Sequence, residues 1–374
     1  MFVPMQEFLI SYTNGIKNEV AFVFDIDGVL LRGKKAIPSA KPALELLNTN
    51  KIPYILLTNG GGVSEKSRVE FISKELNIPI SPSQIVQSHT PMKALAQNNL
   101  YNRVMVVGGP EDKARYVALE YGFKEVITPG DIIRQQPSIS PHHRYTKEQI
   151  ENFTKPDIDL TKPIEAVLIF NDPRDAGTDV QIVCDILNSV EGLIGTKRPF
   201  DDGKDRQKPS IPIIFSNNDF VWANDYPLPR FGQGAFRITV EALYSEMNQL
   251  KHNEKLESTI MGKPFKIQYD FAHSVLINWR NKLIANDVND ANDLTLPNLN
   301  ETPTNSPFKK IYMVGDNPAS DIQGANQNGW ESILLRTGVF KDDDWNHIVA
   351  RPTAGVFDNV YDSVKEILLK NGYN

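Results

Sequence analysis

The sequence has few of the features that mark disulfide-stabilised, membrane-spanning or nucleic-acid-binding proteins. Its 374 residues include one cysteine, Cys184, so there is no disulfide framework. No apolar run reaches the roughly 18 to 20 residues that a membrane span needs. Lysine and arginine total 40 against 46 aspartates and glutamates, a net charge of −6, so no basic excess is available to displace counterions from a nucleic acid. We therefore expect no membrane span and no nucleic-acid partner.

The first residues lack a targeting pattern as well. Residues 1–19 contain Glu7 and no arginine, and no basic segment precedes an apolar one. Both observations are a poor match to a signal or transit peptide. No such peptide is expected within this stretch.

The segment from Val20 to Leu31 is the element around which the chain is organised. Val20–Phe24 is an unbroken apolar run, typical of a strand buried on both faces of a parallel sheet. Asp25 and Asp27 follow directly at its end. In open α/β sheets, ligands bind outside the carboxyl ends of the strands, so we expect chemistry at these two carboxylates.

Two further apolar runs, 54–57 and 311–315, also end in polar residues. These residues are Thr58, Asn59, Asp316 and Asp321. A parallel sheet would bring all these strand ends together, and the clustered carboxylates would repel one another unless a hard cation were present. Oxygen ligands suit Mg²⁺. Because Lys263, between Gly262 and Pro264, adds a fixed positive charge, the set predicts a site for a phosphoryl group.

The middle of the chain predicts a second α/β unit. It contains three apolar runs, 104–109, 166–170 and 211–215, that alternate with helical stretches. A chain of 374 residues is long enough for two domains. We therefore expect a doubly wound parallel-sheet α/β core formed by residues 1–90 and 232–374, with residues 91–231 inserted as a smaller α/β domain.

Two polar segments interrupt these units. Residues 135–163 are rich in Pro, Ser, His and Lys and predict a long surface excursion. Residues 286–307 hold six Asn, three Asp and three Pro, and predict a flexible insertion. No function is assigned to either segment from the sequence.

Four short motifs resemble, in order, those of the haloacid dehalogenase (HAD) superfamily of phosphatases. They are Asp25-Ile26-Asp27-Gly28-Val29, Leu57-Thr58-Asn59, Gly262-Lys263-Pro264 and Gly315-Asp316-x4-Asp321. The resemblance spans about residues 20 to 340 and implies a HAD-like Rossmannoid core. The inserted domain resembles the large α/β cap of subfamily IIA, which determines substrate specificity. Residues 52–62 and 231–236 look most like the fungal mitochondrial hydrolases of the cat eye syndrome critical region protein family.

The resemblance implies Mg²⁺-dependent hydrolysis of a small phosphomonoester through an aspartyl-phosphate intermediate. Asp25 is the implied nucleophile, and Asp27 is the implied general acid and base. The implied phosphate ligands are Thr58, Asn59 and Lys263. The implied Mg²⁺ ligands are Asp25, Asp27 through its carbonyl, Asp316 and Asp321.

Three polar residues of the inserted domain are candidates for contacting the leaving group. They follow apolar runs and are Asp172, Asn218 and Asp219. Residues of these types are also common in ordinary turns, so a purely structural role is the alternative.

Other functions remain open at this stage. A phosphotransferase or mutase would use the same aspartyl chemistry with an acceptor hydroxyl in place of water, and a non-catalytic scaffold would only bind a phosphorylated ligand. The resemblance also fits a homodimer, a mitochondrial location with the cytoplasm as the alternative, and a loose link to glycerophospholipid metabolism.

Overall fold

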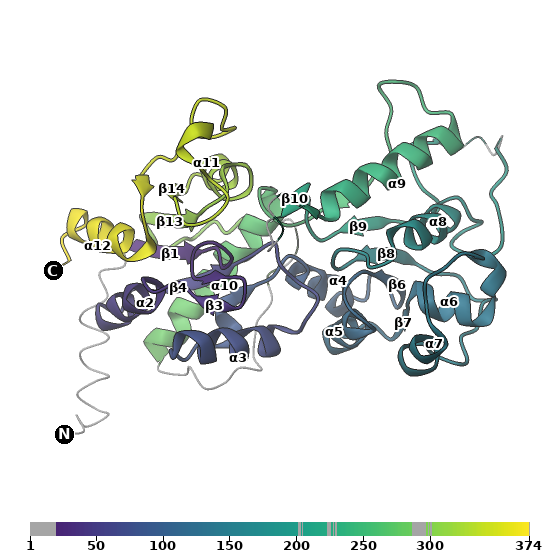
Figure 1. Ribbon diagram of the computed structural model, residues 1–374, viewed down its shortest axis with the longest axis horizontal. Coiled ribbons are helices and arrows are strands. Elements are labelled where there is room, and N and C mark those ends of the chain that lie inside the picture. The colour runs from purple at the N-terminus through teal and green to yellow at the C-terminus, as the bar shows by residue number, and fades with distance from the viewer. Residues whose placement is uncertain are drawn as a thin grey trace. The chain divides into compact units, whose positions relative to one another are not determined.

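The computed structural model describes residues 20–200, 203, 205–222, 226, 228, 230–285, 297, 299 and 301–373 (Figure 1). Contacts between Cα atoms group the chain into two compact units. The core unit takes its residues from 1–58, 65–87 and 263–374. The cap unit takes its residues from 59–64 and 88–262.

A six-stranded parallel sheet forms the centre of the core unit. Its order is β15-β14-β13-β1-β4-β5. The strands are β1 (Val20–Phe24), β4 (Tyr54–Leu57), β5 (Ile85–Val86), β13 (Lys310–Gly315), β14 (Glu331–Leu335) and β15 (Gly355–Phe357). The chain builds the sheet outward from β1 in one direction and then, from β13, in the other. The carboxyl end of β1 therefore lies at the switch point where such sheets bind ligands.

Helices cover both faces of this sheet. Phe22 and Phe24 of β1 point into one core, and Ala21 and Val23 point into the other, which explains why the strand has no polar residue. The first face is covered by α2 (Ala40–Thr49), α3 (Glu65–Leu76) and α12 (Val360–Lys370). The second is covered by α10 (Lys266–Ala285) and α11 (Gln323–Gln327). The predicted doubly wound parallel sheet is confirmed.

The cap unit contains a second parallel sheet, of five strands in the order β12-β9-β8-β6-β7. The strands are β6 (Arg103–Val107), β7 (Glu125–Ile127), β8 (Ala166–Ile169), β9 (Ile213–Phe215) and β12 (Thr259–Ile260). The helices are α4 (Lys93–Gln97), α5 (Lys113–Tyr121), α6 (Pro129–Gln135), α7 (Lys147–Phe153), α8 (Ala176–Leu187) and α9 (Gln233–Asn248). Two short antiparallel pairs complete the strands, β2 (Leu31–Arg32) with β3 (Lys35–Ala36) in the core unit and β10 (Val221–Trp222) with β11 (Arg230–Phe231) in the cap unit.

The boundaries of the cap unit differ from the expected 91 and 231. Phe236, Val240 and Tyr244 of α9 pack into the apolar core of the cap unit, and β12 pairs with β9. The cap unit therefore runs to Gly262. The sequence shows that α9 is a helix, but the sheet against which it packs is set by contacts distant in the chain.

The polar segment 135–163 is largely exposed but contains local structure, including α7. A buried ion pair between Arg115 and Asp131, with 2.7 Å between Nη1 and Oδ2, lies at its base. Asp131 also accepts a hydrogen bond from the backbone N–H of Lys155 at 2.7 Å, which ties the segment to α6. The predicted insertion at 286–307 falls mostly outside the described residues, since 286–296, 298 and 300 are not among them.

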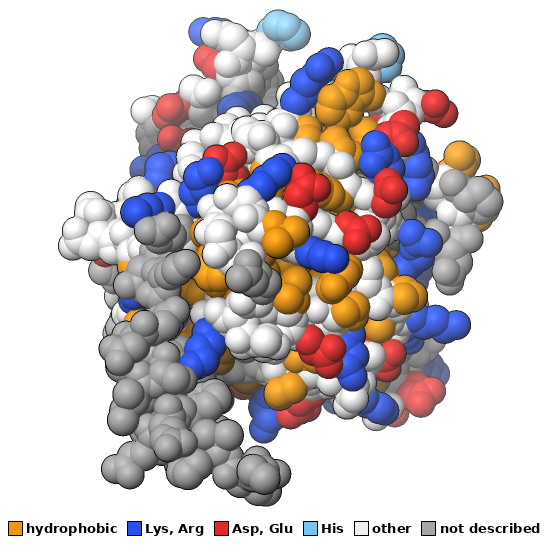
Figure 2. Space-filling view, turned by 90° about the vertical axis from the view of Figure 1, so that its left-hand side faces the viewer, with side chains coloured by type: hydrophobic (Ala, Val, Ile, Leu, Met, Phe, Trp, Pro, Cys, Tyr) orange, Lys and Arg blue, Asp and Glu red, His pale blue; other side chains and the backbone are white. Residues whose placement is uncertain are grey.

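The described surface agrees with the composition. No helix in the described ranges combines the length and the apolar character needed to cross a bilayer. Figure 2 shows one face of the molecule, on which basic and acidic side chains are interspersed.

Candidate active site

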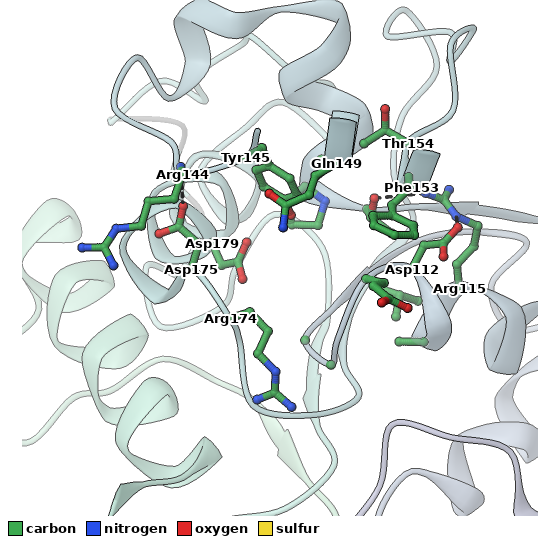
Figure 3. A pocket seen from close by; sticks show the side chains of 18 residues that line it. Asp112, Arg115, Arg144, Tyr145, Gln149, Phe153, Thr154, Arg174, Asp175 and Asp179 are labelled. Carbon is green, nitrogen blue, oxygen red and sulfur yellow. Dashed lines mark hydrogen bonds and ion pairs between the residues drawn. The ribbon is translucent and has the colours of Figure 1, made fainter. Parts of the chain in front are cut away.

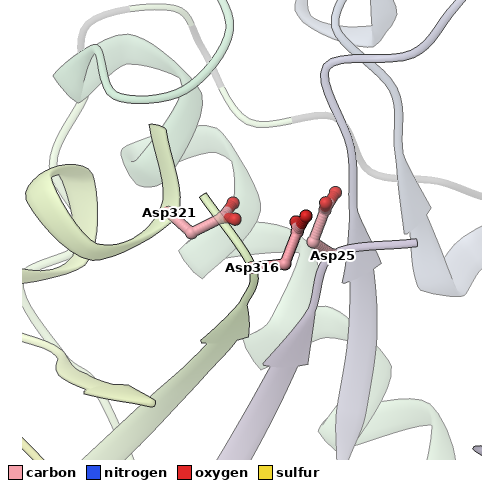
Figure 4. A group of neighbouring side chains, drawn as sticks. All are labelled: Asp25, Asp316 and Asp321. Carbon is pink, nitrogen blue, oxygen red and sulfur yellow. The ribbon is translucent and has the colours of Figure 1, made fainter. Parts of the chain in front are cut away.

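Three carboxylates meet beyond the carboxyl ends of β1 and β13. Asp25, Asp316 and Asp321 are 8%, 3% and 0% exposed. One oxygen of each lies within 4.8 Å of the others, and Figure 4 shows the three side chains grouped above the strands. Strand ends almost 300 positions apart in the sequence thus form one acidic cluster.

Backbone hydrogen bonds position the three aspartates. The sheet ladder continues through Asp25, whose N–H donates to the carbonyl of Val314 at 2.9 Å. Asp316 Oδ2 accepts from the N–H of Val339 at 2.6 Å. Asp321 Oδ2 accepts from the N–H of Asn317 at 3.0 Å. Because backbone amides fix the carboxylates of Asp316 and Asp321, and the sheet fixes the backbone of Asp25, the cluster is organised in advance for binding.

Lys263 is the cation that the sequence predicts beside this cluster. Its Nζ donates to Asp25 Oδ1 at 2.8 Å and to Asp321 Oδ1 at 2.6 Å, and its side chain is 2% exposed. Burial alone would lower the pKa of Lys263, but Asp25 and Asp321 outweigh it and hold the pKa above its usual range. Lys263 is therefore a permanent positive charge at the site.

One lysine does not balance three buried carboxylates. Burial, reinforced by the charges of Asp25 and Asp321, holds the pKa of Asp316 well above its usual value. Burial likewise raises the pKa of Asp321, against the opposing effect of Lys263. Clustered oxygen donors whose charged forms lack a balancing positive charge fit a hard divalent cation such as Mg²⁺.

Asp27 lies apart from the three clustered carboxylates. Its side chain is 56% exposed, and its Oδ2 pairs with Arg68 Nη2 of α3 at 3.2 Å. The surrounding protein still disfavours its charged form and raises the pKa of Asp27; the Asp25 charge adds to this effect and Arg68 opposes it. Arg68 belongs to none of the four motifs, and an exposed pair of this kind contributes little stability.

Thr58 and Asn59 are neighbours in the chain but belong to different units. Thr58 is buried in the core unit, and its N–H donates to the carbonyl of Val86 at 3.0 Å. In the cap unit, Asn59 Nδ2 donates to Asp219 Oδ1 at 3.0 Å, and the Asn59 carbonyl accepts from Asn217 Nδ2 at 3.2 Å. Two residues predicted for different purposes, Asn59 and Asp219, are thus brought together.

The other two candidate residues of the cap unit also have local partners. Asn218 Oδ1 accepts from Arg237 Nε at 2.7 Å. The carbonyl of Asp172 accepts from the N–H of Gly109 at 3.1 Å, while burial raises the pKa of its carboxyl. These hydrogen bonds give each of the two residues a structural role that needs no ligand.

The loop after β14 holds two residues that the sequence reasoning missed. Gly338 lies directly against the Asp316 carboxylate, so that a side chain at this position would occupy the space of Oδ2. The next residue, Val339, donates its N–H to that oxygen. The available signal was a further strand, ending at Leu335, that is followed by polar residues and a glycine.

Replacing Gly338 with alanine is expected to weaken divalent-cation binding, because the new methyl group displaces Asp316. Changes to residues that orient a metal ligand typically cost 10- to 100-fold in metal affinity, so we expect the Mg²⁺ concentration at half-maximal thermal stabilisation to rise about tenfold or more. Gly177→Ala is the matched control, since a Cβ there meets nothing within 4 Å. Equal Mg²⁺ requirements in both variants would contradict the placement of Asp316.

Comparison with protein-family models gives two matches, one toward each end of the chain. A model described as haloacid dehalogenase-like hydrolase matches residues 22–124, and a second HAD hydrolase-like model matches residues 260–363. A mitochondrial hydrolase of Saccharomyces cerevisiae is 49% identical over 353 residues, which cover 94% of this chain and 96% of the relative. A fusion of cardiolipin synthase with a mitochondrial hydrolase in Schizosaccharomyces pombe is 40% identical over 94% of this chain, and the match spans 54% of the fusion protein.

Solved structures show the same fold. A possible sugar phosphatase of Cytophaga hutchinsonii superposes with a TM-score of 0.58 at 17% identity and covers 94% of this chain and 97% of its own. A 4-nitrophenylphosphatase of Thermotoga maritima gives a TM-score of 0.56 at 15% identity, with 93% and 97% covered. The family models, the identity to the yeast hydrolase and the shared fold agree: the chain belongs to the haloacid dehalogenase-like hydrolases.

Proposed function

We propose that this hydrolase is a Mg²⁺-dependent phosphatase that cleaves a phosphomonoester through an aspartyl-phosphate at Asp25. The observation that carries the proposal is the buried cluster of Asp25, Asp316 and Asp321 with Lys263 bonded to two of its members. A carboxylate nucleophile, a fixed cation and a set of oxygen donors at one strand-end switch point suit the transfer of a phosphoryl group.

In the first step, an oxygen of Asp25 attacks phosphorus while the bond from phosphorus to the ester oxygen breaks. Asp27 donates a proton to the departing oxygen, which leaves as an alcohol. Thr58 and Asn59 are the proposed ligands of the phosphoryl oxygens. Lys263 offsets the charge that spreads over these oxygens in the transition state.

In the second step, water attacks phosphorus and the bond to Asp25 breaks. Asp27, now ionised, accepts the proton of that water, so inorganic phosphate leaves and both carboxyl groups return to their starting state. Asp25, Asp316, Asp321 and the carbonyl of Asp27 are the proposed ligands of Mg²⁺. The cation, when bound, neutralises negative charge between the nucleophile and the phosphate.

The substrate class and location are proposed from the relatives. The fusion with a cardiolipin synthase supports a phosphorylated substrate from glycerophospholipid metabolism, and the names of both relatives support a mitochondrial location. A homodimer is proposed from the resemblance of the inserted domain to the caps of subfamily IIA. Light scattering of the purified chain tests this assembly.

Phosphate release from a panel of phosphometabolites and glycerophosphate head groups tests the activity. We expect release with Mg²⁺ and its loss in excess EDTA, because the cluster then keeps an unbalanced negative charge. Phosphorylated alcohols formed when alcohol acceptors compete with water would favour a transferase or mutase instead. If protein that is folded and binds Mg²⁺ releases phosphate from no compound of the panel, the non-catalytic scaffold is favoured.

A further inference from the structure

The cap unit contains a cavity of its own, with a volume of about 150 Å³ (Figure 3). It lies beside the loop that follows β6 and the first turns of α6 and α8. By volume it holds about five water molecules, or one small organic molecule. The residues that define its chemistry are Tyr145, Gln149, Phe153, Arg174, Asp175 and Asp179.

Asp179 is the unusual residue of this cavity. It is 5% exposed, and its Oδ1 is buried without any hydrogen-bond partner. A buried carboxylate oxygen with no donor is costly, because the group has lost its hydration and gained nothing in return. Figure 3 shows the Asp179 carboxylate directed toward the middle of the group of lining side chains. The protein therefore compensates the charge of this carboxylate only in part.

The cations around the cavity do not supply the remaining compensation. Arg115 is committed to Asp131, with Nη1 and Nη2 at 2.7 and 2.8 Å from its two oxygens. Arg144 and Arg174 extend their guanidinium groups away from the Asp179 carboxylate (Figure 3). The neighbouring acid, Asp175, uses Oδ2 to accept from the Arg144 N–H at 3.1 Å and from Thr178 Oγ1 at 2.7 Å.

Two aromatic rings line the same space. Tyr145 and Phe153 are both partly buried, and aromatic faces attract organic cations. Burial, and then the charges of Asp179 and Asp175, raise the pKa of Tyr145, so its hydroxyl stays protonated. A carboxylate with an unmet acceptor beside aromatic rings is the combination that recognises an amine.

We propose that this cavity binds a small organic ammonium ion, which pairs with the carboxylate of Asp179 while its methylene groups lie against Tyr145 and Phe153. The cavity lies within the cap unit, so binding there does not depend on the phosphatase chemistry. The charged groups that line the cavity or pack against it are Glu111, Asp112, Arg115, Asp131, Arg144, Arg174 and Asp175.

The protonation of Asp179 supports the proposal. Burial, with a contribution from Asp175, raises the pKa of Asp179 to about 7. The ionised form is the one that pairs with an ammonium ion, so affinity falls as the pH drops through this range. With a pKa of about 7, we expect binding about tenfold weaker near pH 6 than near pH 8.

The test uses propylamine as the probe and the full chain, with dissociation constants from saturation-transfer NMR titrations near pH 8. 1-Propanol, which has similar size and no charge, is the matched neutral ligand. We expect saturable binding of propylamine and at least tenfold weaker binding of 1-propanol, from the loss of a charge-assisted hydrogen bond of about 1.5 kcal/mol or more. The proposal would be overturned if propylamine binding does not saturate, or if the two probes bind equally. This test needs only the wild-type chain.

Two variants locate the site. Asp179→Asn is expected to weaken propylamine binding about tenfold or more and to remove its pH dependence. Because burial already favours the neutral acid at this position, the carboxamide should fold, which the urea unfolding midpoint checks. Asp185→Asn is the control: it changes another aspartate of α8, which bonds to Gln181 and does not line the cavity. Undiminished binding in Asp179→Asn would also overturn the proposal.

Discussion

Replacing Asp25 with asparagine is expected to abolish phosphate release while leaving the fold intact. The carboxamide has nearly the shape of the carboxylate but cannot attack phosphorus. Loss of a covalent nucleophile in other hydrolases costs up to about 10⁶-fold in kcat, and we expect a loss on the order of 10⁴-fold or more here. The comparison is made on the best substrate of the panel, with saturating Mg²⁺.

The fold of the Asp25→Asn variant is checked by its urea unfolding midpoint. Asp25 is one of three carboxylates in a buried cluster, so removing its charge relieves repulsion with Asp316 while also weakening the bond to Lys263. These effects oppose each other, so we expect a smaller loss in the free energy of unfolding than the about 3 to 5 kcal/mol that breaking a buried ion pair alone costs. Activity retained within tenfold of the wild type would exclude Asp25 as the nucleophile.

Replacing Lys263 with methionine is expected to have the largest effect on stability. The change leaves Asp25 and Asp321 buried without their shared cation. Breaking a buried ion pair by removing one partner typically costs about 3 to 5 kcal/mol, and we expect a loss of this size in the free energy of unfolding. Urea unfolding in EDTA measures it. Activity should also fall, because the positive charge beside the nucleophile is lost.

The stability loss should depend on pH in a defined direction. In Lys263→Met the buried carboxyls bind protons more tightly in the folded than in the unfolded state, so the folded state gains stability as the pH falls. The deficit relative to wild type should therefore be larger near pH 8 than near pH 5. Lys41→Met, which removes an exposed partner of Glu45 in α2, is the control and should change stability by about 0.5 kcal/mol or less. Similar losses in both variants would contradict the buried ion pairs.

The strand ends were predictable because apolar runs and the polar residues that end them are local patterns. Val20–Phe24 contains residues for two cores, so its lack of polar alternation indicated a central parallel strand before any contact was known. The resemblance to known motifs then ordered Asp25, Lys263 and Asp316 into one site. Lys263 does bond to Asp25, although the two are 238 positions apart.

What the sequence did not reveal depends on packing between distant segments. The extent of the cap unit depends on α9 packing against a sheet whose strands lie elsewhere in the chain, and no local signal shows this. Gly338 matters only because the Asp316 carboxylate lies against it. The unmet acceptor of Asp179 is likewise visible only once its neighbours are placed, since in the sequence it is an ordinary aspartate of an amphipathic helix.

Trapping the phosphoenzyme tests the central claim most directly. Asp27→Asn should slow attack of water on the intermediate, because no general base remains to accept the proton of that water. Because Asp27 is also the proposed acid of the first step, the substrate is 4-nitrophenyl phosphate, whose leaving group departs without a proton. Acid quenching of this variant during turnover with Mg²⁺, followed by peptide mass spectrometry, is predicted to place phosphate on the peptide that contains Asp25. Three results together would contradict the account: the wild type releases phosphate, the quenched Asp27→Asn chain carries no phosphate on Asp25, and Asp25→Asn retains turnover.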